Sequence, residues 1–141
     1  SVNHLHFQLF VRPTPLPVAD PRWRHNGGPR PYPTHCRRFD SAERGWAFIE
    51  ALHQAGTSFN LVYLPDRLYC MPRASQGSYA EPAWTTGFAW YELAGGFTVL
   101  AEEVYEELDA TRIEAELARL NLSPDPPGED PGMLSDAPGG C

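Results

Sequence analysis

Three polar side chains near the start of the sequence have the types and the spacing that phosphoryl chemistry requires. They are His4, His6 and Gln8, and one apolar residue separates each from the next. In a β-strand, residues two positions apart point to the same face, about 7 Å apart along the strand. An unprotonated imidazole can attack phosphorus at neutral pH, because the unperturbed pKa of histidine is about 6.5. The neighbouring donors can hold a phosphate oxygen or orient the leaving group.

The sequence leaves two other interpretations of this row open. Two histidines on a strand face can be ordinary exposed polar residues. They can also share a metal ion, which then needs a third ligand. His35 and Cys36 are the candidates for that ligand, and nothing in the sequence fixes their distance from the row. We expect no metal site and no other cofactor.

The row requires a strand to carry it, and residues 3–11 alternate as a strand does. Phe10 lies on the same face of that strand as His4, His6 and Gln8. Residues 12–34 follow with seven prolines, which predicts an extended loop without ladder hydrogen bonds. The apolar side chains on the predicted core face of the strand are Leu5, Phe7, Leu9 and Val11.

The next segments predict a helix followed by a β-hairpin. Asp40 and Ser41 are both suitable N-caps for a helix whose apolar residues recur at helical spacing until Gly56. Residues 58–64 and 67–73 are predicted to form two strands, and a Pro-Asp turn joins them.

The apolar and aromatic residues 87–100 predict a strand to about Leu93, then a bend at two glycines, then a short strand or the start of a helix. One or two helical turns are predicted over 102–108. Asp109 is a suitable N-cap for a further helix over 110–121. The order of these elements predicts an α+β fold, in which helices pack on an antiparallel sheet.

Composition narrows the class of protein. The chain has 141 residues, which is the length of a single domain, and its net charge is −7. That charge argues against a general nucleic-acid binder, and no apolar run approaches the roughly 20 residues of a membrane helix. Three cysteines without a Cys-x-x-Cys motif, and no signal peptide at the start, predict a reducing, cytoplasmic setting.

The basic residues are unevenly distributed. All eleven are arginines, and six of them lie in residues 12–38, where Asp20 is the one acidic residue. The planar guanidinium group suits phosphate, so this segment favours a small anionic ligand. Solvated arginines in a loop are the alternative interpretation.

The run Ser1-Val2-Asn3-His4-Leu5-His6-Phe7-Gln8 resembles the active-site strand of the histidine triad superfamily, in the branch where glutamine replaces the third histidine. It resembles above all the GDP-hexose phosphorylases, and more distantly diadenosine tetraphosphate phosphorylase and galactose-1-phosphate uridylyltransferase. The resemblance continues in the same order over residues 1–108. The further segments that carry it are Pro15-Leu16-Pro17-Val18, Tyr32-Pro33 with Phe39, the hairpin of 59–73 with its Asn60, and Tyr91-Glu92-Leu93-Ala94-Gly95.

The resemblance implies a role for each residue of the first strand. His6 would be the nucleophile, attacking the α-phosphorus of a nucleoside diphosphate conjugate to form a covalent nucleotidyl-histidine. His4 would brace the strand, and Gln8 would hydrogen-bond phosphate oxygens. Asn3 and Ser1 lie where the family places polar contacts on the phosphate side. The implied mechanism replaces one difficult displacement by two easier steps.

Three hairpin residues complete the predicted substrate-binding set. The resemblance points to Asn60, although this side chain can also simply bond the backbone of the hairpin. Arg67 and Arg73 are six positions apart on one strand, so they share a face and could flank a phosphate. A solvated sheet edge is the other interpretation of the two arginines.

The implied activity is a nucleotidyltransferase or phosphorylase with a nucleotide-sugar and inorganic phosphate as substrates. A dinucleoside polyphosphate phosphorylase or hydrolase is one alternative, and a non-catalytic nucleotide-binding module is another. We expect no nucleic-acid partner and no membrane. The oligomeric state stays open, with a homodimer as one option.

The family enzymes carry a long segment before this strand, whereas the present sequence has three residues before His4. We therefore expect residues 1–122 to be the C-terminal part of a histidine-triad-like nucleotidyltransferase domain that is incomplete on its own. One option is that this part is inactive alone. Residues 123–141 contain five prolines, four glycines and four acidic residues, which predicts a disordered tail.

Overall fold

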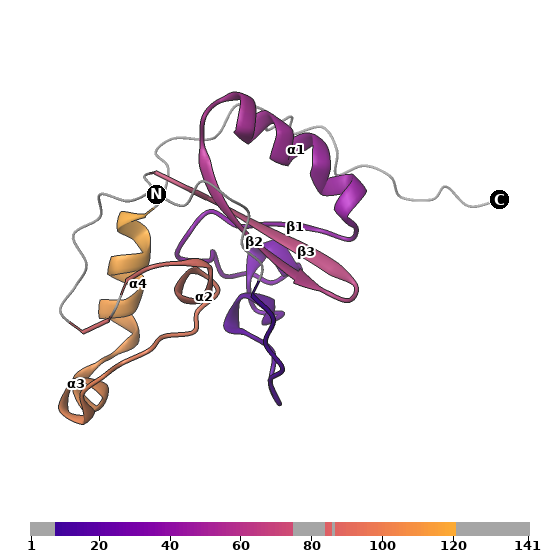
Figure 1. The fold of residues 1–141 in the computed structure, drawn as a ribbon. Coiled ribbons are helices and arrows are strands. Elements are labelled where there is room, and N and C mark those ends of the chain that lie inside the picture. The colour runs from indigo at the N-terminus through magenta and orange to yellow at the C-terminus, as the bar shows by residue number, and fades with distance from the viewer. Residues whose placement is uncertain (1–7, 75–83, 86, 121–141) are drawn as a thin grey trace.

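A three-stranded antiparallel sheet lies at the centre of the structure, a computed structural model that describes residues 8–74, 84–85 and 87–120 (Figure 1). The strands are β1 (Arg37–Phe39), β2 (Ser58–Leu64) and β3 (Arg67–Arg73), in the order β1-β3-β2. The predicted hairpin is confirmed with its boundaries, and Leu61 pairs with Cys70 in its register. Together with the helices, this sheet confirms the α+β class.

Helix α1 (Ala42–Gln54) covers one face of the sheet (Figure 1). Ser41 is its N-cap, because the Ser41 hydroxyl accepts a hydrogen bond of 3.3 Å from the backbone N–H of Arg44. Ile49 and Leu52 of the helix pack in one cluster with Leu68 and Cys70 of β3. The predicted helix is therefore confirmed.

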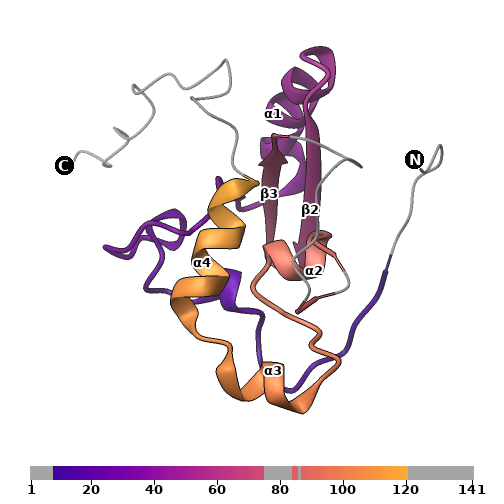
Figure 2. The ribbon, with the colours of Figure 1, turned by 90° about the vertical axis from the view of Figure 1, so that its left-hand side faces the viewer.

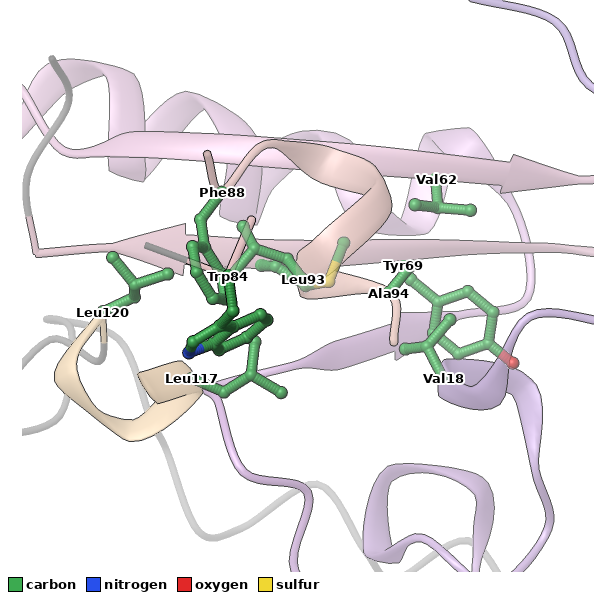
Figure 3. Close-up of a cluster of buried hydrophobic side chains, with 10 residues drawn as sticks. Val18, Val62, Tyr69, Trp84, Phe88, Leu93, Ala94, Leu117 and Leu120 are labelled. Atoms are coloured by element: carbon green, nitrogen blue, oxygen red, sulfur yellow. The ribbon is translucent and has the colours of Figure 1, made fainter. Parts of the chain in front are cut away.

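The opposite face of the sheet is covered by helices α2 (Trp90–Leu93) and α4 (Ala110–Arg119) (Figure 2). Side chains from both helices and from β2 and β3 form the larger apolar core (Figure 3). Strand β3 therefore has apolar neighbours on both faces, which explains its nearly continuous burial. The fully buried members of this core include Val18, Tyr69, Met71, Leu93, Leu117 and Leu120.

The proline-rich segment forms two short 3₁₀ turns, η1 (Pro17–Ala19) and η2 (Arg24–Asn26). Hydrogen bonds to the α2 region hold it in place. The Val18 N–H donates to the Ala94 carbonyl at 3.0 Å, and the Tyr32 hydroxyl donates to the Leu93 carbonyl at 2.7 Å. The prediction of a loop is confirmed, and a single bridge between Trp23 and Arg30 is its only β pairing outside the named strands in the described ranges.

The prediction of a strand over 3–11 is wrong for its described part, residues 8–11, which form no ladder with any described strand. Leu9 and Val11, expected in the core, are 93% and 94% exposed. The reason is that the segment approaches α2 with its other face, as described below. Residues 1–7 lie outside the described residues.

The prediction of a strand up to Leu93 is also wrong. Residues 90–93 form helix α2 instead, where a carboxylate oxygen of Glu92 accepts a hydrogen bond of 2.9 Å from the Ala89 N–H. Gly95 then has a φ of +88°, a left-handed conformation that ends the turn. Short apolar runs do not distinguish a strand from a buried helical turn, which is why periodicity failed here.

The two C-terminal helices agree with the sequence. Helix α3 (Glu102–Glu107) occupies the predicted turns, and the Asp109 carboxylate caps α4 through a 2.8 Å hydrogen bond from the Arg112 N–H. Helix α4 ends two residues before the predicted 121. In the described part of the chain, no helix is both long and apolar enough to cross a bilayer.

Candidate functional site

Gln8 is the one member of the predicted catalytic row that the structure describes. His4 and His6, and the predicted phosphate contacts Ser1 and Asn3, lie outside the described residues. The Gln8 side chain is exposed, and its carbonyl oxygen Oε1 accepts a hydrogen bond from the indole N–H of Trp90 at the start of α2. The end of the row is therefore attached to α2 rather than to a neighbouring strand.

Alternate residues of the segment 8–12 make this attachment. The Phe10 ring packs edge-on against Trp90 at 5.3 Å between centroids, and it stacks on Tyr91 at 5.8 Å. The Arg12 guanidinium donates a hydrogen bond of 2.7 Å to the Tyr91 hydroxyl. Gln8, Phe10 and Arg12 thus face α2, which is the alternation of an extended chain. The alternation expected from sequence is present, but the face that carries these three residues contacts a helix.

Asn60 and Arg73 are brought together on neighbouring strands. Asn60 pairs with Met71 and Arg73 pairs with Ser58, so the two side chains are diagonal neighbours on one face of the hairpin. The distance between Arg73 Nη1 and the Asn60 side-chain oxygen is 3.5 Å. Met71 lies on the same face and belongs to the core beneath α2 and α4. The pair therefore lies on the α2 side of the sheet.

Arg73 is half-buried, and its surroundings leave part of its hydrogen-bonding capacity unused. The Nε atom is enclosed and has no hydrogen-bond partner among the described residues. Burial lowers the pKa of the Arg73 guanidinium below the ordinary arginine value. Arginine nevertheless stays protonated in proteins, so the charge is retained. A partly enclosed cation that has no acidic partner in the described part of the chain is a suitable place for an anion.

Arg67 lies at the opposite end of β3 from Arg73. The two arginines share a face, as expected, but six residues of strand separate them by about 20 Å. Arg67 Nε donates a hydrogen bond of 2.9 Å to a carboxylate oxygen of the adjacent Asp66, and this hydrogen bond raises the pKa of Arg67. The idea that both arginines flank one phosphate is therefore wrong, and Arg67 is paired within its own turn.

The basic segment 12–38 does not converge on one ligand site. Arg22 forms an ion pair with Asp20 at 3.2 Å, and Arg38 forms one with Asp40 at 2.9 Å. Arg12 binds Tyr91, and the Arg37 guanidinium lies 4.6 Å from the centre of the Phe48 ring. Four of the six arginines thus have partners of their own, which neither the anionic-ligand nor the solvated-loop interpretation predicted.

Cys36, one of the two candidate metal ligands outside the row, is a partly buried free thiol. Burial raises the pKa of Cys36, and burial raises the pKa of Cys70 to about 12, so both thiols stay protonated. Where the structure describes the chain, no group of three His, Cys, Asp or Glu side chains could hold a metal ion. His4 and His6 lie outside these residues.

Trp90 and Tyr91 are the site residues that sequence reasoning missed. Both are partly buried in α2, and together they hold Gln8, Phe10 and Arg12. A signal was present in the sequence, since those three residues alternate at the end of the row and two adjacent aromatic residues precede Glu92.

Comparison of the chain with protein-family models, with curated proteins and with solved structures gives no match.

Proposed function

We propose that this chain carries the nucleophile of a nucleotidyl-transfer reaction, with His6 as the residue that becomes nucleotidylated. The donor is a nucleoside diphosphate conjugate of the GDP-hexose type, and the acceptor is inorganic phosphate. The observation that carries the proposal is the attachment of Gln8, the last residue of the row, to the same side of the sheet as the half-buried Arg73. Both groups can donate hydrogen bonds to anionic oxygens.

The reaction proceeds in two displacements at the α-phosphorus. In the first, a nitrogen lone pair of His6 forms a P–N bond while the P–O bond to the hexose phosphate breaks, and hexose 1-phosphate leaves with the electron pair. In the second, an oxygen of inorganic phosphate attacks the same phosphorus and the P–N bond breaks. The electron pair returns to the imidazole, and a nucleoside diphosphate is released.

The other residues act on the charge of the phosphates. Gln8 donates to an oxygen of the phosphate that His6 attacks. Arg73, oriented by the Asn60 side-chain oxygen, neutralises a second phosphate of the conjugate. An anion bound there would give the Nε atom of Arg73 the partner that this atom lacks among the described residues. His4 braces the row. Arg67 is left out of the site, because Asp66 already pairs with it at the far end of β3.

The proposal includes a histidine-triad-like fold and a cytoplasmic setting. The three-stranded antiparallel sheet with helices on both faces is compatible with such a fold. Cys36 and Cys70 are free thiols, as a reducing compartment favours.

Detection of the covalent intermediate tests this proposal. The complete natural protein that carries these residues is incubated with GDP-glucose, GDP-galactose or diadenosine tetraphosphate, quenched, and analysed by intact mass and peptide mapping. We expect an acid-labile, alkali-stable nucleotidyl adduct on His6 with a GDP-hexose. His6→Ala should abolish adduct and turnover, whereas His4→Ala should only weaken them.

The other outcomes distinguish the alternatives. An adduct formed from diadenosine tetraphosphate alone would replace the nucleotide-sugar by a dinucleoside polyphosphate as the donor. Nucleotide binding without an adduct on any substrate would overturn the catalytic proposal in favour of a binding module. Equal turnover of His6→Ala and the parent protein would also overturn it.

A further inference from the structure

The side-chain amide of Gln8 has a defined orientation because of its partner. An indole nitrogen can only donate a hydrogen bond, so the group that Trp90 contacts must be the carbonyl oxygen of the amide, Oε1. The two N–H bonds of the amide then point away from Trp90. The hydrogen bond thus presents Gln8 as a donor, which is the role that an anionic oxygen requires.

The surface that holds the segment is itself firmly fixed. The ring of Tyr91 lies against Gly96, where an added Cβ atom would come within 2.4 Å of the ring. The Gly96 N–H donates to the Tyr91 carbonyl at 2.9 Å. Behind the two aromatic residues, Leu93 and Ala94 are fully buried in the core. The Tyr91 ring is therefore held against Gly96, and the Trp90 ring packs against the larger core.

The contacts of this surface also set the register of the segment. The Trp90 indole donates a hydrogen bond to Gln8, both rings contact the Phe10 ring, and the Tyr91 hydroxyl accepts a hydrogen bond from Arg12. A shift by one residue would turn Leu9 and Val11 towards α2 and would remove all of these contacts. These contacts therefore fix the register of Gln8 on α2.

We propose that Trp90 and Tyr91 are positioning residues for Gln8: Trp90 orients the Gln8 amide as a hydrogen-bond donor to phosphate, and both rings fix the register of residues 8–12 that carry it. This inference rests on the proposed function, because it states how Gln8 acts in that reaction. It adds two residues of α2 to the site and assigns them no contact with the substrate.

A double-mutant cycle tests whether Trp90 acts through Gln8. The variants are Trp90→Phe, Gln8→Ala and the combination of both, prepared in the same complete natural protein. Trp46→Phe is the matched control, since Trp46 is exposed on α1 at the other face of the sheet. The measured quantity is the rate of His6 adduct formation at saturating GDP-hexose, and the melting temperature of each variant is recorded.

We expect Trp90→Phe to slow adduct formation by roughly ten- to a hundredfold, as misplacement of a reacting group does. The double variant should be no slower than Gln8→Ala alone, because a group that acts only through Gln8 has no effect once Gln8 is gone. Trp46→Phe should leave the rate unchanged. Independent, multiplicative losses in the double variant would overturn the inference, and so would an unchanged rate in Trp90→Phe.

Two further measurements separate this inference from the proposed function. The indole N–H resonance of Trp90, assigned by its disappearance in Trp90→Phe, should move upfield in Gln8→Ala, and an unmoved resonance would contradict the hydrogen bond. Gln8→Glu keeps an acceptor for Trp90 but has no donor, so it should slow adduct formation while residues 8–12 stay attached. If the unmodified protein forms no adduct, the proposed function fails and this inference fails with it. If it forms one independently of Trp90, only this inference fails.

Discussion

At the scale of single residues, the position of an arginine on its strand decides what it can do. Arg67 and Arg73 occupy the two ends of β3 and the same face, yet their surroundings differ. Asp66 satisfies Arg67 at the hairpin turn, whereas Arg73 is half-buried beside an amide oxygen. We expect an anion to bind more strongly at Arg73 than at Arg67, since the Arg73 guanidinium has no acidic partner among the described side chains.

This difference gives a matched pair of substitutions. We expect Arg73→Gln to weaken nucleotide binding by roughly tenfold, the size of a lost charge-assisted hydrogen bond. Arg67→Gln should leave the affinity within about twofold, because it loses only an exposed ion pair. Isothermal titration of both variants with the nucleotide measures this. A larger effect at Arg67 would show that the anion binds at the other end of the sheet.

A second residue-scale prediction concerns His25. Its ring nitrogen Nε2 donates to the Val18 carbonyl at 2.8 Å, and burial lowers the pKa of His25 below 6.5. The unfolded chain therefore binds more protons than the folded protein just below pH 6.5. The corresponding stability is fully present above that pH and is lost as the pH falls towards the folded pKa.

His25→Gln keeps a donor for Val18 and removes the titration. We expect its free energy of unfolding to depend less steeply on pH between about pH 5 and pH 7 than that of the parent protein. Urea unfolding at several pH values gives both slopes. Identical slopes would mean that protonation of His25 does not affect folding.

At the scale of elements, the sequence pattern predicts the long periodic segments and misses β1 and α2. Helix α1 and the hairpin β2–β3 have enough residues for their periods to be recognised. Strand β1 has three residues and α2 has four, so packing rather than local pattern defines them. The predicted strand at 8–11 has the right alternation but docks on α2, a partner that no local pattern reveals.

The same limits apply to the candidate site. The row and the two arginines were chosen from residue types and spacing, and Asn60 from the family resemblance. Arg67 was grouped with Arg73 because parity gives the face on which a residue lies and not its distance along the strand. Trp90 and Tyr91 were missed because a strand pattern places adjacent residues on opposite faces. In the helical turn, both rings contact Phe10.

Helix α1 offers a test of the cap that distinguishes two adjacent residues. Ser41→Ala should lower the free energy of unfolding by about 1 kcal/mol, because the N–H of Arg44 loses its acceptor. Asp40→Ala should have a smaller effect, since Asp40 forms only exposed ion pairs with Arg38 and Arg44. Chemical denaturation of both variants provides the comparison. A larger loss in Asp40→Ala would assign the cap to Asp40.

At the scale of the whole molecule, the sheet separates two apolar cores. The smaller core joins α1 to the sheet, and the larger joins the sheet to α2, α4 and the proline-rich segment. Asn60, Arg73 and Gln8 all lie on the side of the larger core. The tail 123–141 is predicted from its composition to add nothing to either core.

Deletion of residues 123–141 tests that prediction. The shortened chain should have the same melting temperature as the parent within about 2 °C, since a change of 1 kcal/mol would shift it by roughly 2–8 °C. Thermal unfolding followed by circular dichroism is the measurement. A clear fall in melting temperature would mean that the tail packs against the domain.

The central strand β3 lies between the two cores and contributes residues to both. Neighbouring residues along it belong to different cores, as Cys70 faces α1 while Met71 faces α2 and α4. Local opening of a protein often follows such boundaries, so we expect α1 to separate from the sheet as a unit of its own. The half of the molecule that holds Gln8 and Arg73 then keeps its packing. We therefore expect substitutions in the smaller core to lower the stability of α1 before they disturb the packing around Gln8 and Arg73.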